Sequence, residues 1–103
     1  MPASLEVATE REGNACWIFQ IRRGGESTNQ CEMTLAWADY DWWSPTGRHT
    51  PSEVALAVMG VIAATQADGG AAIGAADRFD ASTIRRRIPG ADALIIARLA
   101  RRP

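Results

Sequence analysis

Lysine is absent from the 103-residue chain, so all 11 basic residues are arginine, and histidine occurs once, at His49. A serine or cysteine nucleophile needs a nearby base and an orienting group, and a single histidine offers little for that role. Asp39, Asp41 and His49 match no spacing of a metal-binding loop, and the run of oxygen donors found in an EF-hand is missing. The sequence therefore predicts no enzyme, no metal site and no cofactor.

Long hydrophobic segments are absent as well. The longest apolar stretch, residues 54–64, is interrupted by Gly60 and falls short of the roughly 18 residues of a membrane span. The first residues, Met-Pro-Ala-Ser-Leu-Glu, lack the basic region and apolar core of a secretory signal. We therefore expect a cytoplasmic protein with no membrane partner.

Cysteine occurs only at Cys16 and Cys31. The strand assignment given below places the two side chains on opposite faces of one sheet. A disulfide would then have to pass through the sheet, which disulfide geometry forbids. We expect both residues to remain thiols, which fits a reducing compartment.

Alternation of apolar and polar residues predicts three strands, at residues 4–10, 15–23 and 29–38. Turn-forming residues separate them, Glu-Gly-Asn at 12–14 and Gly-Gly-Glu-Ser at 24–27. Three strands at this spacing form an antiparallel meander. The predicted core face consists of Leu5, Val7, Trp17, Phe19, Ile21, Cys31, Met33, Leu35 and Trp37.

Helix signals follow the strands. Thr50, Pro51 and Glu53 form a Thr-x-x-Glu capping box with proline at the first helical position. Asp80 is the predicted N-cap of the next helix, which the Pro-Gly pair at 89–90 ends early. The predicted helices cover residues 51–68, 81–88 and 91–102.

These elements predict an α+β fold in a single domain over residues 1–103. Apolar residues make up 47% of the chain, and a chain of this size buries roughly two-thirds of its unfolded surface. The helix at 51–68 is apolar nearly all round, so it is either buried on several sides or contacts a partner. The small residues at 69–77 predict a mobile connector.

The most unusual run is Asp39, Tyr40, Asp41, Trp42 and Trp43, which follows the point where the strand alternation breaks. We interpret it as a loop, because continued alternation would bury two carboxylates. One alternative is that one tryptophan covers the core edge and the other the start of the next helix. The other is a surface for a protein partner, since exposed tryptophan and tyrosine are typical of binding hot spots.

Arg48, His49 and Thr50 lead into a helix N-terminus, where free N–H groups and the helix dipole favour a phosphate or carboxylate. This predicts a possible anion-binding site. Pro51 removes one donor and Glu53 adds a competing negative charge. The alternative is that His49 makes only a packing contact with the helix.

Charge is distributed unevenly along the chain. Residues 1–77 hold 4 Arg against 10 Asp or Glu, a net −6, whereas residues 78–103 hold 7 Arg against 2 Asp, a net +5. A basic segment of this kind suits nucleic acid or an acidic protein partner. The alternative is that the arginines are solvated and offset the negative ends of the helix dipoles. The candidate residues are Arg85, Arg86, Arg87, Arg98, Arg101 and Arg102.

The outer face of the predicted sheet is small or apolar at its centre, so a helix, a homodimer mate or another protein is expected to cover it. Together these features predict a small non-enzymatic protein-binding domain, an adaptor, regulator or inhibitor. Analogy at the level of the fold alone favours a bacterial or phage protein. The alternatives are association with nucleic acid through the arginine-rich third, and a small enzyme or anion-binding protein that uses residues 48–50.

Overall fold

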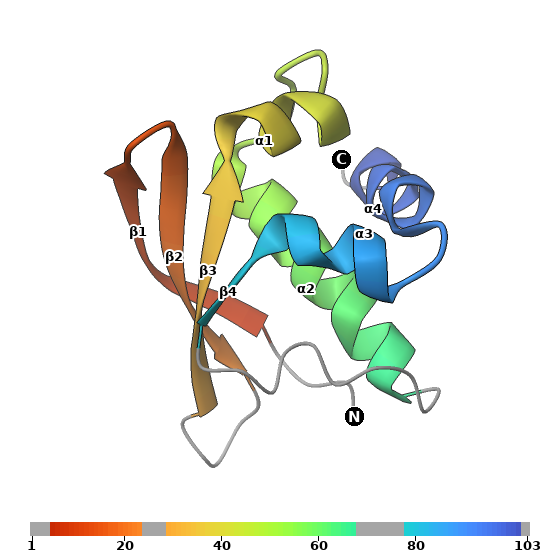
Figure 1. The fold of residues 1–103 in the computed structure, drawn as a ribbon, viewed down its shortest axis with the longest axis horizontal. Helices are drawn as coiled ribbons and strands as arrows, with labels where there is room; N and C mark the ends of the chain where they lie inside the picture. Colours follow the sequence, from red (N-terminus) through yellow and green to blue (C-terminus); the bar gives the residue numbers. More distant parts are fainter. Residues whose placement is uncertain (1–4, 24–28, 68–77, 102–103) are drawn as a thin grey trace.

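The computed structural model describes residues 5–23, 29–67 and 78–101, and they form an α+β fold in which the helices lie on one face of a sheet (Figure 1). The strands are β1 (Leu5–Gly13), β2 (Cys16–Arg23), β3 (Asn29–Ala36) and β4 (Arg78–Asp80). The helices are α1 (Trp37–Trp43), α2 (Pro51–Ala67), the 3-10 helix η2 (Ala81–Thr83), α3 (Ile84–Arg87) and α4 (Ala91–Ala100). The predicted fold class is confirmed.

The antiparallel meander of β1, β2 and β3 is confirmed in its pairing. Phe19 lies opposite Met33 and Ile21 opposite Cys31, and all four side chains are buried. The first strand is longer than predicted, because the hairpin turn is at residues 14–15 rather than 12–14. A register shift between Val7 and Thr9 marks a bulge in β1. Such a bulge protects an edge strand from pairing with another chain.

The third strand ends earlier than predicted, at Ala36. Trp37 is the first residue of α1 and its side chain is 43% exposed, so its assignment to the core face was wrong. Its backbone N–H donates to the carbonyl of Ala15 at 3.0 Å, which holds the start of the helix against the β1–β2 turn. Helical geometry places Asp39 and Trp43, four residues apart, on one face, and both are buried.

A fourth strand extends the predicted three-stranded sheet. β4 pairs in parallel with β3, where Phe79 lies opposite Met33. The Asp80 carboxylate accepts from the backbone N–H of Ser82 at 2.9 Å, so the predicted N-cap is confirmed, but it opens a 3-10 turn that continues into α3. The predicted connector at 69–77 lies outside the described residues.

Helix α2 crosses the inner face of the sheet and packs against α4 on its other side. Its capping box is confirmed: the N–H of Thr50 donates to the Glu53 carboxylate at 2.8 Å, and the N–H of Glu53 donates to the Thr50 hydroxyl at 3.2 Å. Burial on several sides explains why the helix is apolar nearly all round. Its buried residues are Val54, Ala55, Ala57, Val58, Met59, Gly60, Val61 and Ile62.

One hydrophobic core joins the sheet to the helices. Cys31 belongs to this core and Cys16 lies on the opposite face of the sheet, and no disulfide joins them, as predicted. Within the described part of the chain, no helix is both long and apolar enough to cross a membrane.

Candidate functional site

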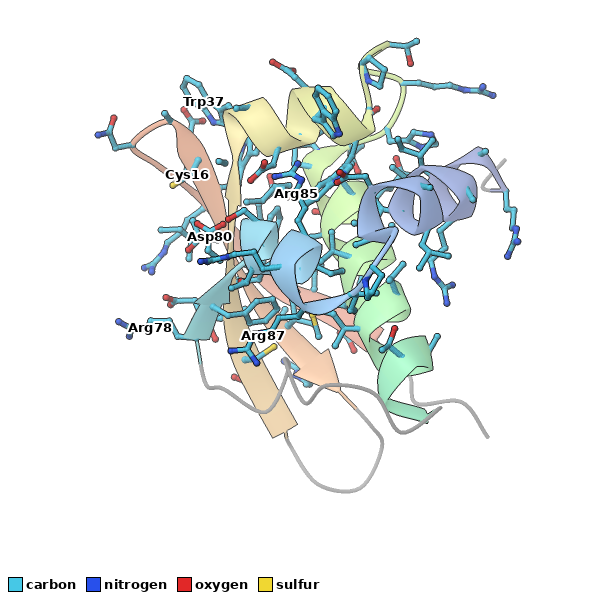
Figure 2. The ribbon with its side chains drawn as sticks, turned by 45° about the vertical axis from the view of Figure 1, so that its right-hand side comes forward. Cys16, Trp37, Arg78, Asp80, Arg85 and Arg87 are labelled. Atoms are coloured by element: carbon cyan, nitrogen blue, oxygen red, sulfur yellow. The ribbon has the colours of Figure 1, made fainter. Side chains whose placement is uncertain are left out.

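Four side chains from α1, α3 and α4 meet beneath α1 and form the ion cluster: Asp39, Trp43, Arg85 and Asp92. Arg85 donates from Nη1 to Asp39 Oδ1 at 2.7 Å and from Nε to Asp92 Oδ1 at 2.9 Å. The Trp43 indole N–H donates to the same Asp92 oxygen at 2.7 Å. The Arg85 guanidinium carbon lies 4.8 Å from the centre of the Trp43 ring, a cation–π distance. Figure 2 shows Arg85 in the space between α3 and α1.

The ion cluster stabilises the charged forms of its members. Burial opposes ionisation of Asp92, but hydrogen bonds from Trp43 and Arg85 and the positive charge of Arg85 outweigh it and hold the pKa of Asp92 below its ordinary value. Burial likewise opposes the charge of Arg85, and the hydrogen bonds to Asp39 and Asp92 raise its pKa. Each polar group that the cluster buries therefore has a charged partner, which is typical of a structural tie between helices.

Tyr40 also has a structural position. Its ring packs edge-on against Trp17 with the centroids 5.2 Å apart, and its hydroxyl donates to the carbonyl of His49. Trp37 contacts the other side of Trp17 at a centroid distance of 6.1 Å. Of the predicted recognition run, Asp39, Tyr40 and Trp43 thus join α1 to the rest of the fold.

The remaining two residues of that run, Asp41 and Trp42, face solvent. The Trp42 side chain is 63% exposed, whereas that of its neighbour Trp43 is 1% exposed. Trp42 nevertheless lies close to α4. Its side chain donates a hydrogen bond to Asp92 of that helix, which helps to lower the pKa of Asp92. The structure therefore divides the predicted run into a buried side and an exposed side, and Trp42 of the exposed side borders α4.

Helix α4 exposes apolar residues where a surface helix normally carries polar ones. It buries one narrow stripe, Ala91, Ile95 and Leu99. Leu94 and Ile96 lie on either side of that stripe and are 48% and 43% exposed. We define the outer apolar surface as Trp42 of α1 together with Ala93, Leu94, Ile96, Ala97 and Ala100 of α4, all of which are exposed.

The outer apolar surface continues into a groove of about 250 Å³ between α2 and α4. Arg98 lies along its edge and donates from Nη2 to the carbonyl of Gly60 at 3.2 Å. A Cβ atom at Gly60 would come within 2.9 Å of the Arg98 guanidinium carbon, so the glycine is what allows the arginine to lie this close to α2. The groove is lined by Val61, Ala64, Thr65, Leu94, Ala97, Arg98 and Arg101.

The predicted arginine group occupies several environments. Arg85 belongs to the ion cluster, Arg98 and Arg101 line the groove, and Arg102 lies outside the described residues. Arg86 and Arg87 are exposed on α3, and neither forms an ion pair with another described residue. Figure 2 shows Arg87 on the side of β4, away from α4. The structure therefore does not bring the five described arginines of this group together in one track.

The predicted anion site at the start of α2 contains an acidic side chain of its own. Arg48 is exposed, and His49 is half-buried with its Nδ1 atom 4.0 Å from Glu53 Oε1. The same carboxylate oxygen accepts the backbone N–H of Thr50. A negative charge therefore already lies where an incoming anion would bind, which disfavours that site.

The outer face of the sheet is more polar than the sequence suggested. Glu32 accepts from Gln20 at 3.0 Å and forms ion pairs with Arg11 and Arg78, each at 3.4 Å, so one carboxylate links residues of all four strands. Ala38, the last residue of the third predicted strand (29–38), lies in α1 and not in the sheet. None of the described helices covers this face (Figure 1). The polar links make it a less suitable docking surface than the exposed side of α4.

Sequence reasoning missed Leu94 and Ile96 as surface residues. The last predicted helix, residues 91–102, contains four large apolar residues, and these cover more than one helical stripe: Leu94, Ile95, Ile96 and Leu99. That excess width was the available signal.

Among the described residues, no group of three or more His, Cys, Asp or Glu side chains is arranged to hold a metal ion. No protein-family model matches this chain, and neither a curated protein nor a solved structure matches it.

Proposed function

We propose that this protein is a binding domain, an adaptor, regulator or inhibitor that acts by protein–protein contact through the outer apolar surface. The observation that carries this proposal is the exposure of Trp42 beside an apolar stretch of α4. Large apolar side chains that gather on one exposed face are typical of interaction sites. Tryptophan is also among the residues that contribute most to binding energy at interfaces.

The surroundings of the surface support the same proposal. An apolar groove with an arginine edge adjoins it, and interfaces combine an apolar centre with a polar rim. The ion cluster beneath α1 ties together the two helices that carry the surface, so it is presented on a rigid support. Cys16 and Cys31 are not joined by a disulfide, which is typical of a reducing compartment and supports action in the cytoplasm.

Substitution of Trp42 tests the proposal. The tagged full-length chain is used to isolate a protein partner from cells, and the affinity of the purified partner is then measured for each variant. We expect Trp42→Ala to weaken binding at least about tenfold, because truncation of a central aromatic residue typically costs more than about 1.4 kcal/mol.

Trp37→Ala is the matched control, because it removes a second exposed tryptophan from the other end of α1 (Figure 2). It is expected to leave the affinity close to that of the wild type. If Trp42→Ala binds normally while Trp37→Ala does not, the contact surface is elsewhere. Thermal denaturation of both variants shows whether a loss of binding reflects a loss of folding.

Association with nucleic acid is a second candidate, favoured by the exposure of Arg86 and Arg87, which form no ion pair with another described residue. Phosphate contacts by these side chains would give an affinity that falls as salt rises. The test is fluorescence anisotropy with labelled DNA and RNA at two salt concentrations, for the wild type and for the Arg86→Glu/Arg87→Glu double variant. Binding that neither salt nor the double variant weakens would contradict this candidate.

A further inference from the structure

Two arginines line the groove between α2 and α4, and neither forms an ion pair with another described residue. The hydrogen bond from Arg98 to the carbonyl of Gly60 holds one of them along the edge of the groove. Arg101 follows three residues later in the chain and lines the same groove. The described residues that line the groove include no carboxylate, so the two guanidinium groups give it a local charge of +2.

The rest of the groove is mostly apolar. Val61 and Ala64 line it from α2, and Leu94 and Ala97 line it from α4. The remaining polar side chain, Thr65, donates its hydroxyl to the carbonyl of Val61 at 2.9 Å, so its hydrogen is already used within its own helix. Ala64, Leu94 and Ala97 are exposed, so the groove is open to solvent. It therefore offers an apolar contact beside two positive charges.

Gly60 gives Arg98 its place in this groove. Glycine in the middle of a helix is destabilising relative to alanine. A Cβ atom at this position would lie 2.8 Å from the Nε atom of Arg98, and the three atoms that it would approach most closely all belong to that arginine. The space that the glycine leaves on α2 is thus used by Arg98. The position of this charge is fixed by both helices.

The size and composition of the groove indicate what it can bind. Its volume of about 250 Å³ lies below the roughly 300–1,000 Å³ of pockets that enclose a small molecule, so it suits one or two side chains of a larger partner. The phosphate backbone of a nucleic acid would use the arginines and leave the apolar residues without a contact. A polypeptide that carries a large apolar residue beside Asp or Glu uses both.

We propose that the groove between α2 and α4 binds an acidic segment of the partner protein, in which a large apolar side chain enters the groove and a neighbouring carboxylate pairs with Arg98 and Arg101. This inference rests on the proposed function, because the groove continues the outer apolar surface, and it adds the chemistry of the partner. Guanidinium–carboxylate pairs beside an apolar contact fix its orientation and exclude basic segments.

The first test selects ligands without knowledge of the partner. A random dodecapeptide library displayed on phage is panned on the purified full-length chain and, in parallel, on the Arg98→Gln/Arg101→Gln double variant. We expect the wild type to enrich peptides in which Leu, Ile or Phe adjoins Asp or Glu, and the double variant to lose that enrichment. Peptides without acidic residues, the same peptides on both proteins, or no enrichment on the wild type would each overturn the inference.

The second test measures affinities by fluorescence anisotropy, with a labelled synthetic peptide of the enriched sequence. Arg101→Gln should weaken binding several-fold and the double variant about tenfold, because each exposed ion pair contributes modestly. Added salt should weaken the wild type more than the double variant. Thermal denaturation shows whether each variant is folded, and Arg101→Gln decides the question if the double variant is not.

Arg86→Gln/Arg87→Gln is the matched control for the second test. It removes two exposed arginines of α3 that form no ion pair with another described residue, so the change of net charge is the same. The control should leave the affinity for the peptide unchanged. A peptide that the control releases and the groove variant retains would place the acidic contact on α3 and overturn the inference.

Gly60→Ala tests the position of Arg98 without a change of charge. The added methyl group meets only the end of a flexible side chain, so the variant should be at least as stable as the wild type in thermal denaturation. The affinity for the peptide should nevertheless fall several-fold, because Arg98 has to leave its place on α2. A folded Gly60→Ala variant with unchanged affinity would overturn the pairing with Arg98.

Trp42→Ala separates this inference from the proposed function. A protein partner that Trp42→Ala weakens and the Arg98→Gln/Arg101→Gln variant does not would overturn the groove and leave the binding function intact. A partner that neither variant weakens would overturn both. If the double variant loses labelled DNA or RNA while the library yields no acidic peptide, the two arginines contact phosphate and the inference is wrong.

Discussion

The two sides of α1 carry different kinds of residue. The side toward the protein carries Asp39, which lies with Arg85 and Asp92 between the helices, whereas the side toward solvent carries Trp42, beside the exposed apolar residues of α4. A surface helix normally turns its charged residues to solvent and its large apolar ones inward. The inner side fixes the position of the two helices, and the outer side is the one that we propose for contact with a partner. The two consecutive tryptophans lie on different sides, Trp43 on the inner side and Trp42 on the outer side.

Replacement of the buried tryptophan should have the largest effect on stability. Trp43→Ala removes a side chain that is only 1% exposed and leaves the Asp92 carboxylate without one donor. We expect a loss of about 3–5 kcal/mol in the free energy of unfolding, measured by urea denaturation.

Trp42→Ala is the matched control, because it makes the same change one residue away. Its effect on the free energy of unfolding should be much smaller, about 1 kcal/mol or less, because Trp42 is exposed and the substitution removes mainly its hydrogen bond to Asp92. Equal destabilisation by the two substitutions would mean that the two sides of α1 do not differ as the structure indicates.

Removal of the arginine at the centre of the ion cluster should have the next largest effect. Arg85→Ala leaves two carboxylates close together without a counter-charge. We expect a loss of about 2 kcal/mol, less than the 3–5 kcal/mol typical of a fully buried ion pair, because the Arg85 side chain is 32% exposed. Equilibrium denaturation measures the loss.

The neighbouring exposed arginine provides the control for this prediction. Arg86→Ala should change the free energy of unfolding by less than about 0.5 kcal/mol. Adding Asp39→Asn to Arg85→Ala should recover part of the loss, because the substitution removes one of the two uncompensated charges. An Arg85→Ala variant as stable as the wild type would contradict a structural role for the ion cluster.

Elements that depend on residues nearby in the sequence could be predicted, whereas elements that depend on contacts with distant residues could not. The three strands and the capping box of α2 depend on local patterns, so the sequence alone predicted them. Helix α1 has no side-chain cap at Ala36, and its first residue continues the strand alternation, so no local signal marks its start. The short strand β4 becomes a strand only because it pairs with β3, far away in the sequence.

The candidate site shows the same limit. The sequence treated the run 39–43 as one unit in a loop, whereas these residues belong to α1. Because α1 is helical, the residues of the run point to two different sides. The side with Asp39 is buried against Arg85, which is 46 residues away in the sequence. The exposed residues of α4 were missed because a helix wheel does not show which of several apolar stripes will face the core.

Protonation of Asp92, on the inner side, should have the smallest of these effects. The pKa of Asp92 is lower in the folded protein than its ordinary value, so protons bind more readily to the unfolded chain. The stability that Asp92 contributes is therefore fully present above about pH 4, the pKa of an unfolded aspartate, and is lost as the pH falls through the lower folded value. Thermal denaturation between neutral pH and about pH 2.5 should show the advantage of the wild type over Asp92→Asn narrowing below about pH 4. If Asp92→Asn and the wild type differ equally at every pH, the ionised carboxylate of Asp92 is not what stabilises the inner side.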